Sequence, residues 1–453
     1  MELNKKAQKL LFFTVAFLLV ITTFNYHHHV ISPELHESIS QNAKYYSDQL
    51  SDIYHSSYSS NSETEISSEK ERIFESLNQP AFKSDGKSPK QIMKDNTKFV
   101  RSLLAKPIED PKLLKLVQKE EFKELENATF VSLVRNSELN GIIKTIKQIE
   151  ETFNDKFHYP YTFLNDQPFT ENFKSSILKE IPGSQVHFAE ISSSEWDKPS
   201  FIDEKLETRG IKELEEVGVG YAGKLSYHNM CRYYSKGFYN HPILKEFKYY
   251  WRIEPSTNYF CQIDYDVFKF MKDNNKVYGF VLNLYDSPHS VKSLWNETLR
   301  FLKNNTQHIN ENGAHKWITE NLQNPSNFEI AKGYSTCHFW SNFEIGDMDF
   351  YRSEAYSSWV EHLDKTGGFY YERWGDAPVH SIGLGLFADK SQIHWFRDIG
   401  YEHTPYLNCP NSNKCNTALC PKGKFSRFNG MDSQNCLATW AKYEMTDEQL
   451  NNY

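Results

Sequence analysis

A carboxylate stands where a predicted buried strand ends. Residues 249–253 are aromatic or β-branched apart from Arg252, Glu254 follows them, and Pro255 stops the strand. Ligands bind at the carboxyl ends of strands in an α/β sheet, because the loops there let backbone and side chains converge. A carboxylate in that position can hold a divalent cation, and the cation can hold a diphosphate. An exposed glutamate, or one paired with Arg252, explains the same residues equally well.

Two further regions are dense in residues that could do chemistry. Residues 337–344 combine an acid and an amide with aromatic side chains, as sugar-binding sites do. Core packing explains the aromatic residues too, whereas Glu344 is an acid within an aromatic run. In residues 370–381, His380 closely follows the rigid Pro378 and could bind a ligand from a fixed direction. A lone histidine is more often structural, so these residues alone leave its role open.

Residues 218–223 match G-x-G-x-x-G, the fingerprint of dinucleotide-binding loops. In dinucleotide-binding folds the motif follows a strand, whereas in this chain it follows a charged, helix-like stretch at residues 211–216. We therefore expect a flexible loop at this position and no dinucleotide site.

Alternating strands and helices would position the candidate residues. Strand-like stretches occupy residues 128–134, 159–164 and 185–189, and apolar residues recur at helical spacing in 139–153 and 169–178. This order is typical of an α/β fold with a parallel, nucleotide-binding sheet. An α/β core that binds no nucleotide has the same pattern.

Composition narrows the class of protein. The 453 residues are enough for one large domain or two ordinary ones. The net charge of −8 argues against nucleic acid as a partner, because nucleic-acid-binding proteins present a basic face. Four of the seven cysteines lie near the C-terminus without the spacing of a zinc site, so disulfides are the better explanation in an oxidising compartment.

The N-terminal segment indicates a membrane anchor. Residues 10–24 are uncharged and mostly apolar, Lys5, Lys6 and Lys9 precede them, and no small-x-small cleavage site follows. Basic residues before the span place the short tail in the cytosol and the rest of the chain in the lumen. We predict a cytosolic tail at 1–9, a signal anchor at 10–26, a polar stem at 27–125 that ends in a helix at 112–125, and a catalytic domain at 126–453.

Several long motifs occur in order between Asn127 and Cys409. They read YYWRIEP, IDYDVF, CHFWSNFEIGDMDFYR, GGFYYERWGDAPVHSIGLGLF and HWFRDIGYEHTPYLNCP. In these motifs the chain resembles the fungal Golgi α-1,2-mannosyltransferases, glycosyltransferase family 15. The resemblance implies a GT-A-type fold, retaining transfer of mannose from GDP-mannose to the mannose-containing glycans of glycoproteins, a Mn2+ cofactor, and a type II anchor in the Golgi membrane.

The resemblance also implies roles for single residues. Glu254 and His380 would bind the metal. Glu344 would be the catalytic carboxylate, either attacking the sugar carbon or steadying an oxocarbenium-like transition state. Tyr227 would be an active-site tyrosine. The implied contacts to the donor are Arg135, Tyr227, Arg232 and Glu254.

The chain departs from the family pattern near the strand-end glutamate. Ser256 and Thr257 stand where members often carry an aspartate, and Gln262 replaces an acid common before IDYDVF. That motif contains Asp264-Tyr265-Asp266, which spells D-x-D, the usual metal motif of GT-A enzymes. We predict that Asp266 instead caps a helix at 267–271, a position that aspartate favours, and that Glu254 holds the metal.

Three alternatives stay open. A mannosylphosphate transferase on the same scaffold would use GDP-mannose but transfer mannose 1-phosphate. A glycoside hydrolase would use Glu254 and Glu344 as its acid pair and need no metal. A non-catalytic mannan-binding protein would keep the aromatic residues without needing metal ligands.

Overall fold

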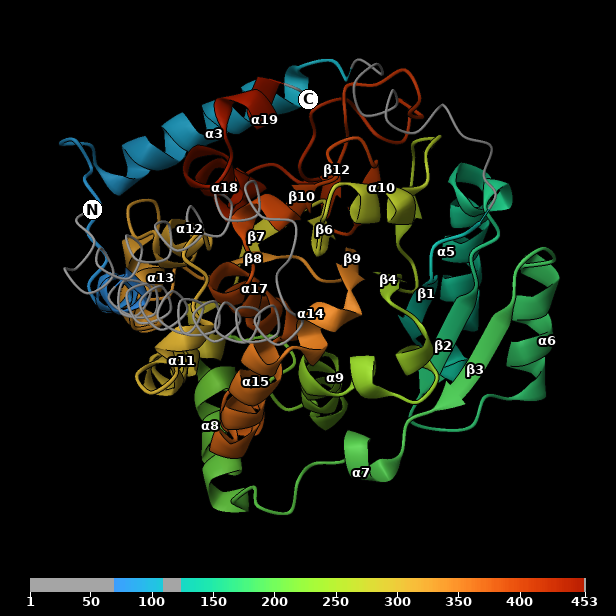
Figure 1. Cartoon of the computed structure of the whole chain (residues 1–453), viewed down its shortest axis with the longest axis horizontal. Helices are drawn as coiled ribbons and strands as arrows, with labels where there is room; N and C mark the ends of the chain where they lie inside the picture. The colour runs from blue at the N-terminus through green and yellow to red at the C-terminus, as the bar shows by residue number, and fades with distance from the viewer. Residues whose placement is uncertain (1–68, 109–123, 452–453) are drawn as a thin grey trace, which may run out of the picture. The chain divides into compact units, whose positions relative to one another are not determined.

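A computed structural model of the chain describes residues 69–108 and 124–451. The chain divides into Met1–Glu69 and Lys70–Tyr453, and the second unit carries the described fold (Figure 1). The anchor predicted at 10–26 and nearly all of the helix predicted at 112–125 lie outside the described residues. Within the described ranges, no helix is both long and apolar enough to cross a membrane.

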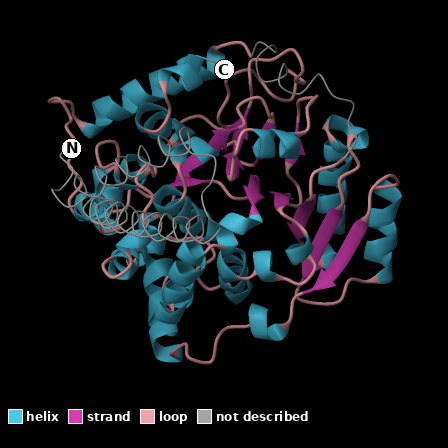
Figure 2. Ribbon diagram, viewed as in Figure 1, coloured by secondary structure: helices cyan, strands magenta, loops and turns pink. Residues whose placement is uncertain are grey.

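A seven-stranded sheet forms the centre of this unit, in the order β10-β6-β9-β4-β1-β2-β3 (Figures 1 and 2). Strands β4, β1, β2 and β3 run parallel, as do β10 and β6, and β9 lies antiparallel between β4 and β6. The predicted α/β fold with a mainly parallel sheet is confirmed. The strands are β1 Ala128–Leu133, β2 Tyr161–Asn165, β3 Val186–Glu190, β4 Tyr249–Arg252, β6 Tyr278–Phe280, β9 Glu344–Asp347 and β10 Ile393–Trp395.

Two small sheets adjoin the large one. Strand β11 (Tyr401–His403) pairs antiparallel with β5 (Asn258–Tyr259) and with β12 (Tyr406–Asn408). Strand β7 (Asn283–Tyr285) pairs antiparallel with β8 (Cys337–Phe339). The first of these sheets matters for the site, because it brings a segment near residue 400 back to the chain that follows β4.

One face of the large sheet is covered by α5 (Leu139–Thr152), α6 (Glu171–Glu180) and α10 (Val267–Asp273). Helix α5 follows from its sequence, because Ile142, Ile146 and Ile149 fall on one side at helical spacing and are buried. These residues pack with Phe130 and Trp251, which alternate on their strands with residues of the opposite face.

The opposite face carries α9 (Leu225–Lys236), α15 (Glu354–Thr366) and α17 (Asp376–Phe387). Helix α17 is buried along its length, and only Phe387 at its end is not. Glycines permit this close packing: a β-carbon at Gly383 would lie 2.7 Å from the Tyr356 ring. A helix apolar on every side belongs in a core, so its polar residues need partners there.

Part of the stem predicted at 27–125 forms a helix that packs on the folded unit. Helix α3 (Pro89–Ala105) starts with a Ser88 cap and buries Val100, Leu103 and Leu104. It packs on α18 (Leu437–Tyr443), and Asn96 Nδ2 donates to Gln323 Oε1 at 2.5 Å. The described residues 70–108 therefore lie in the same compact unit as the sheet, before the boundary predicted at 126.

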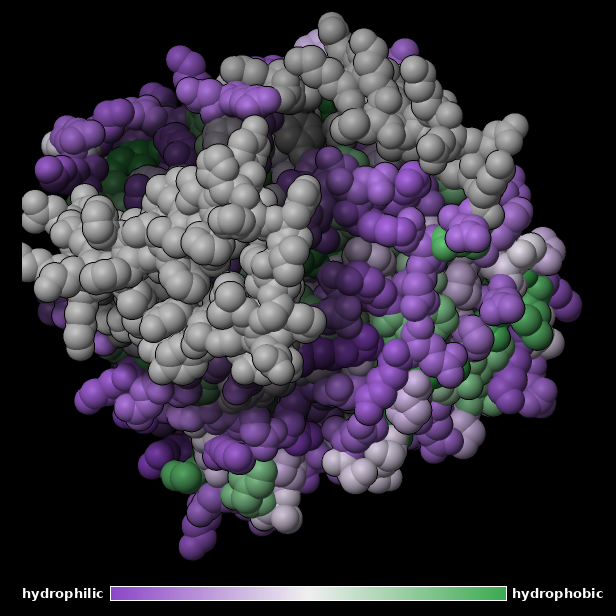
Figure 3. All heavy atoms as spheres, in the orientation of Figure 1, coloured by the Kyte–Doolittle hydropathy of each residue, from purple (hydrophilic) through white to green (hydrophobic). Residues whose placement is uncertain are grey.

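The remaining helices complete the shell around the sheet. They are α7 Ser193–Trp196, α8 Glu204–Glu216, α11 Leu294–Leu302, α12 His315–Thr319, α13 Pro325–Ile330, α14 Met348–Arg352, α16 Gly368–Tyr371 and α19 Asp447–Asn451. On the face in Figure 3 the described surface is mainly hydrophilic, with apolar residues in small groups.

Disulfides account for six cysteines. The pairs are Cys261–Cys415, Cys337–Cys436 and Cys409–Cys420, and Cys231 is a buried free thiol. The preference for disulfides over a zinc site is thus confirmed.

The prediction for the D-x-D motif is also confirmed in its structural part. Asp266 Oδ1 accepts from the backbone N–H groups of Phe268 and Lys269 at the start of α10, and Oδ2 accepts from the Tyr159 hydroxyl at 2.7 Å. Asp264 is instead paired with Lys156 and Lys414 at the surface.

We predict that Asp266→Ala lowers the free energy of unfolding by about 2 kcal/mol, because it removes a helix cap and a buried hydrogen bond. Urea denaturation measures this loss. Asp264→Ala is the matched control and should cost less than about 1 kcal/mol, as exposed ion pairs do. If either substitution abolishes Mn2+ binding by the folded protein, the motif is a metal site after all.

Candidate active site

A cavity of about 190 Å³ opens at the edge of the sheet where β1, β2 and β4 end. Because these strands are parallel, the residues that follow them meet at one edge. The start of α9 forms the opposite wall. The polar and aromatic lining comprises Arg135, Glu138, Asn165, Asp166, Trp196, Lys224, Ser226, Tyr227, Tyr234 and Glu254. Glu254 thus lies where the sequence predicted a strand-end carboxylate.

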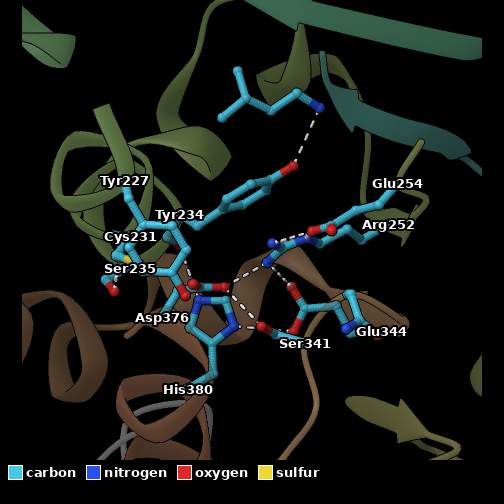
Figure 4. Close-up of polar contacts among 12 residues, drawn as sticks. Tyr227, Cys231, Tyr234, Ser235, Arg252, Glu254, Ser341, Glu344, Asp376 and His380 are labelled. Carbon is cyan, nitrogen blue, oxygen red and sulfur yellow. Dashed lines mark hydrogen bonds and ion pairs between the residues drawn. The ribbon is translucent and has the colours of Figure 1, made fainter. Parts of the chain in front are cut away.

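Arg252 lies at the centre of the charged groups beneath this cavity (Figure 4). Its side chain is 3% exposed, and its guanidinium carbon lies 3.6 Å from the centre of the Tyr234 ring. Nη2 and Nε donate to Glu254 Oε1 at 2.5 and 3.1 Å, and Nη1 donates to Asp376 Oδ2 at 2.5 Å. Burial opposes its charge, but Asp376 and Glu254 outweigh that effect and raise the pKa of Arg252 well above its usual range.

Asp376 and Glu344 reach Arg252 from two other elements. Asp376 begins α17 and also accepts from Ser341 Oγ at 2.8 Å. Glu344 begins β9 directly opposite Arg252 in the antiparallel pair, with Oε1 3.6 Å from Nη1. Burial acts against ionisation of Asp376, yet Arg252 and His380 hold the pKa of Asp376 below its usual range.

His380, a predicted metal ligand, lies in the core behind the cavity. The ring is fully buried, Nδ1 lies 3.0 Å from Glu344 Oε2, and Nε2 lies 2.9 Å from the carbonyl oxygen of Tyr234. Each ring nitrogen thus faces an oxygen atom inside the core, so neither is left free to bind a metal at the cavity. Burial disfavours the charged ring, but Glu344 outweighs it and raises the pKa of His380.

His403 is the imidazole that faces Glu254. It ends β11, and its Nε2 lies 4.0 Å from Glu254 Oε2, while the other oxygen of Glu254 is held by Arg252. Both side chains are partly open, 35% for His403 and 25% for Glu254. The separation is too long for a hydrogen bond and leaves one carboxylate oxygen and one imidazole nitrogen directed at the same space.

This pair fits a Mn2+ ion that completes its coordination with diphosphate oxygens and water. Manganese accepts imidazole as well as carboxylate, and nucleotide-bound divalent ions usually take only one or two protein ligands. In the described residues no cluster of three or more His, Cys, Asp or Glu side chains could hold a metal by itself. The chemistry of Glu254 and His403 therefore matches an ion that is held jointly with a nucleotide.

Glu344 does not reach the cavity wall. It is fully buried, and it accepts from the Tyr278 hydroxyl at 3.0 Å and from His380. Its other oxygen, Oε1, has no hydrogen-bond partner among the described residues. The geometry therefore gives Glu344 an electrostatic role behind Arg252, rather than direct access to a sugar carbon.

Tyr227 does lie at the cavity, as predicted. Its hydroxyl accepts from Arg373 Nη1 at 3.3 Å, and Arg373 Nη2 lies 3.4 Å from Asp286 Oδ1. The neighbouring Cys231 and burial raise the pKa of Tyr227 well above its usual range. The hydroxyl therefore keeps its proton and can donate it in a hydrogen bond.

Of the two arginines predicted to contact the sugar donor, one lies at the cavity and the other does not. Arg135 lies at the cavity, paired with Glu138 at 2.7 Å. Arg232 does not: its Nε and Nη2 form a bidentate pair with Asp364 at 2.6 and 3.0 Å on another side of α9. Residues two apart on a helix point to opposite sides, and Met230 is the one that faces the cavity. The structure therefore places Arg232, a predicted donor contact, against Asp364 and outside the cavity lining.

Comparison with known proteins identifies the family. Residues 78–445 match the family model described as glycolipid 2-alpha-mannosyltransferase, glycosyltransferase family 15. The chain belongs to this family. The probable mannosyltransferase KTR4 of Saccharomyces cerevisiae is 47% identical over 84% of this chain and 83% of its own. Alpha-1,2 mannosyltransferase KTR1 from the same yeast is 43% identical over 64% of this chain and 73% of its own.

Two solved structures of family members share the fold. The S. cerevisiae mannosyltransferase Ktr4p in complex with GDP has a TM-score of 0.82 and 47% identity, and covers 85% of this chain and 99% of its own. Core-mannan synthase A of Aspergillus fumigatus, in a Mn/GDP form, has a TM-score of 0.71 and 46% identity, covering 75% and 93%. The family predicted from the motifs is thus confirmed.

We predict that His403→Ala and His380→Gln respond differently to Mn2+. Loss of a metal ligand should raise the Mn2+ concentration for half-maximal activity at least about tenfold, with partial recovery at high Mn2+. His380→Gln should lower stability and turnover without moving that concentration, because the ring lies behind Arg252. Mn2+ titrations of initial rate measure both. A shift for His380→Gln but not for His403→Ala would restore His380 as the ligand.

Proposed function

We propose that the protein is a retaining α-1,2-mannosyltransferase that moves mannose from GDP-mannose to mannose-containing glycans of glycoproteins, with Mn2+ as cofactor. The observation that carries the proposal is the Glu254–His403 pair in a family 15 fold, with Glu254 in the lining of the strand-end cavity and His403 Nε2 4.0 Å from its free oxygen. GDP and Mn/GDP in the two related structures support the donor and the ion.

Different residues at the cavity would have different roles in this reaction. The nucleoside would lie against the ends of β1 and β2, with Arg135 beside it, and Glu254 and His403 would hold the ion. When bound, Mn2+ offsets the charge that develops on the departing diphosphate. Lys224 at the start of α9 adds a cation to the same wall.

Tyr227 is suited to orient the reacting groups. Its hydroxyl is fixed by Arg373 and remains protonated, so it can donate to an oxygen that carries developing charge. Behind the cavity, Arg252 fixes the direction of Glu254, while Glu344 and Asp376 balance the guanidinium charge. Because Glu344 is buried away from the cavity wall, it is poorly placed to attack the sugar carbon. This favours front-face attack, in which the acceptor attacks from the side of the leaving group. Glu344 then serves to balance the charge of Arg252.

We also propose that the chain is a type II protein of the Golgi membrane with a luminal catalytic unit. The basic flank before the apolar run at 10–24 supports this orientation. Three disulfides in the described unit support an oxidising compartment.

Product analysis tests the function. The full-length chain in detergent, with GDP-[14C]mannose, Mn2+ and methyl α-mannoside, should yield a disaccharide that an α-1,2-specific mannosidase cleaves. We expect Glu344→Gln to lower kcat by about 10²–10³ with GDP affinity nearly unchanged, because it removes a preorganised charge. Circular dichroism checks that the variant folds.

Other products would overturn the proposal. An acid-labile mannosyl phosphate would identify a mannosylphosphate transferase, and release of mannose from the acceptor would identify a hydrolase. Binding of mannoside without turnover would leave a lectin. Full activity of Glu344→Gln would remove the charge-balancing role of Glu344.

A further inference from the structure

The loop between α8 and α9 presents an exposed tyrosine on a strained backbone. Tyr221 has a φ of 63° and is 61% exposed. A bulky residue in the left-handed region is a conformational outlier, and such outliers gather at functional sites. The loop is the G-x-G-x-x-G stretch at 218–223, and it joins two helices rather than a strand and a helix.

The loop is held so that Tyr221 projects outward. Val219 and Ala222 on either side are buried against Leu214, and His228 Nε2 donates to the carbonyl oxygen of Ala222 at 2.8 Å. The backbone of Tyr221 is tied as well, since its carbonyl accepts from the N–H of Lys224 at 3.0 Å. These contacts hold the backbone of the loop, while the ring of Tyr221 remains exposed.

The ring continues the wall of the cavity. Tyr221 stacks on Tyr227 with ring centres 4.7 Å apart and planes 10° apart. Lys224 Nζ lies 5.6 Å from the Tyr221 ring centre, and both Lys224 and Tyr227 line the cavity. Tyr221 is therefore a second aromatic layer, placed just outside the tyrosine that we assign to the reacting groups.

This position suits the acceptor sugar better than the donor. In the proposed reaction the nucleoside lies against the residues that follow β1 and β2, whereas Tyr221 stacks on Tyr227 at the opposite wall, outside the cavity lining, and is open to solvent. A pyranose offers a C–H face to an aromatic ring and hydroxyl groups to a phenol, which is how aromatic side chains hold sugars.

We propose that Tyr221 is the platform on which the acceptor mannoside stacks, with Tyr227 behind it positioning the reacting hydroxyl. The inference rests on the proposed mannosyl transfer and adds a specificity-determining residue for the acceptor. The strain at Tyr221 is then the consequence of holding a large ring at a point where the loop must turn sharply.

Kinetics of three loop variants test the platform. Tyr221→Gly removes the ring and suits the positive φ, Tyr221→Phe keeps the ring, and Val217→Ala removes another exposed apolar side chain of the same loop. The assay uses the full-length chain with GDP-mannose, Mn2+ and methyl α-mannoside, varying each substrate in turn. Transfer of mannose to water is measured without acceptor.

We expect Tyr221→Gly to raise the acceptor KM about tenfold, which corresponds to ~1.4 kcal/mol. Its KM for GDP-mannose and its hydrolysis rate without acceptor should match the wild type, because the donor side is untouched. Tyr221→Phe and Val217→Ala should stay within about twofold of the wild type in acceptor KM, equal to less than ~0.5 kcal/mol.

Two results would overturn the platform while leaving mannosyl transfer intact. One is an unchanged acceptor KM in Tyr221→Gly. The other is an equal rise in the KM values for donor and acceptor, which would make Tyr221 a structural or donor-side residue. Absence of transfer by the wild-type chain would instead remove the proposed function, and the platform with it.

Discussion

The site depends on one buried cation. The guanidinium of Arg252 lies over the Tyr234 ring and divides its donors between Glu254, at the cavity, and Asp376, below it. A guanidinium has a rigid, planar set of donors, so fixing one carboxylate direction fixes the other. Replacing Arg252 by a neutral residue would leave Asp376 and Glu344 as buried carboxylates without their cation, which costs about 3–5 kcal/mol. The direction of Glu254 toward the cavity thus depends on Arg252, whose charge is balanced in the core by Asp376 and Glu344.

Long-range pairing brings these groups together. The register of β4 against β9 sets Glu344 opposite Arg252, the start of the buried helix α17 supplies Asp376, and β11 returns His403 to the strand-end glutamate. Each group comes from a different element, so the site is assembled only when the strands of the large sheet have paired in their final order. The fold also separates two roles, because the charge of Arg252 is balanced in the core, while Glu254 lines the cavity and His403 stays partly exposed beside it.

The local sequence pattern was enough to predict the strands, helices and helix caps that depend on residues close together in the chain. The strands β1 to β3 and helices α5 and α6 follow from apolar periodicity, and the place of Glu254 and the cap by Asp266 follow from strand and helix ends. The choice between His380 and His403 was different: nothing near either histidine in the sequence shows that His380 lies in the core with both nitrogens facing core oxygen atoms. The pairing of Arg232 away from the cavity could have been predicted, because helical spacing sets Arg232 apart from Tyr227 and Met230. The Ser88 cap before an amphipathic helix could likewise have indicated folded structure before residue 126.

The central claim is that Arg252 aims Glu254 at a metal held jointly with GDP. Calorimetric titration of GDP into Arg252→Lys, with and without Mn2+, tests it most directly. Lysine keeps the charge but lacks the fork that reaches Glu254 and Asp376 at once. The account predicts a folded variant whose GDP affinity in Mn2+ is weaker by at least about tenfold, a typical cost of losing the partner that orients a metal ligand, with metal-free GDP binding unchanged. An unchanged Mn2+-dependent affinity in a folded Arg252→Lys would contradict it.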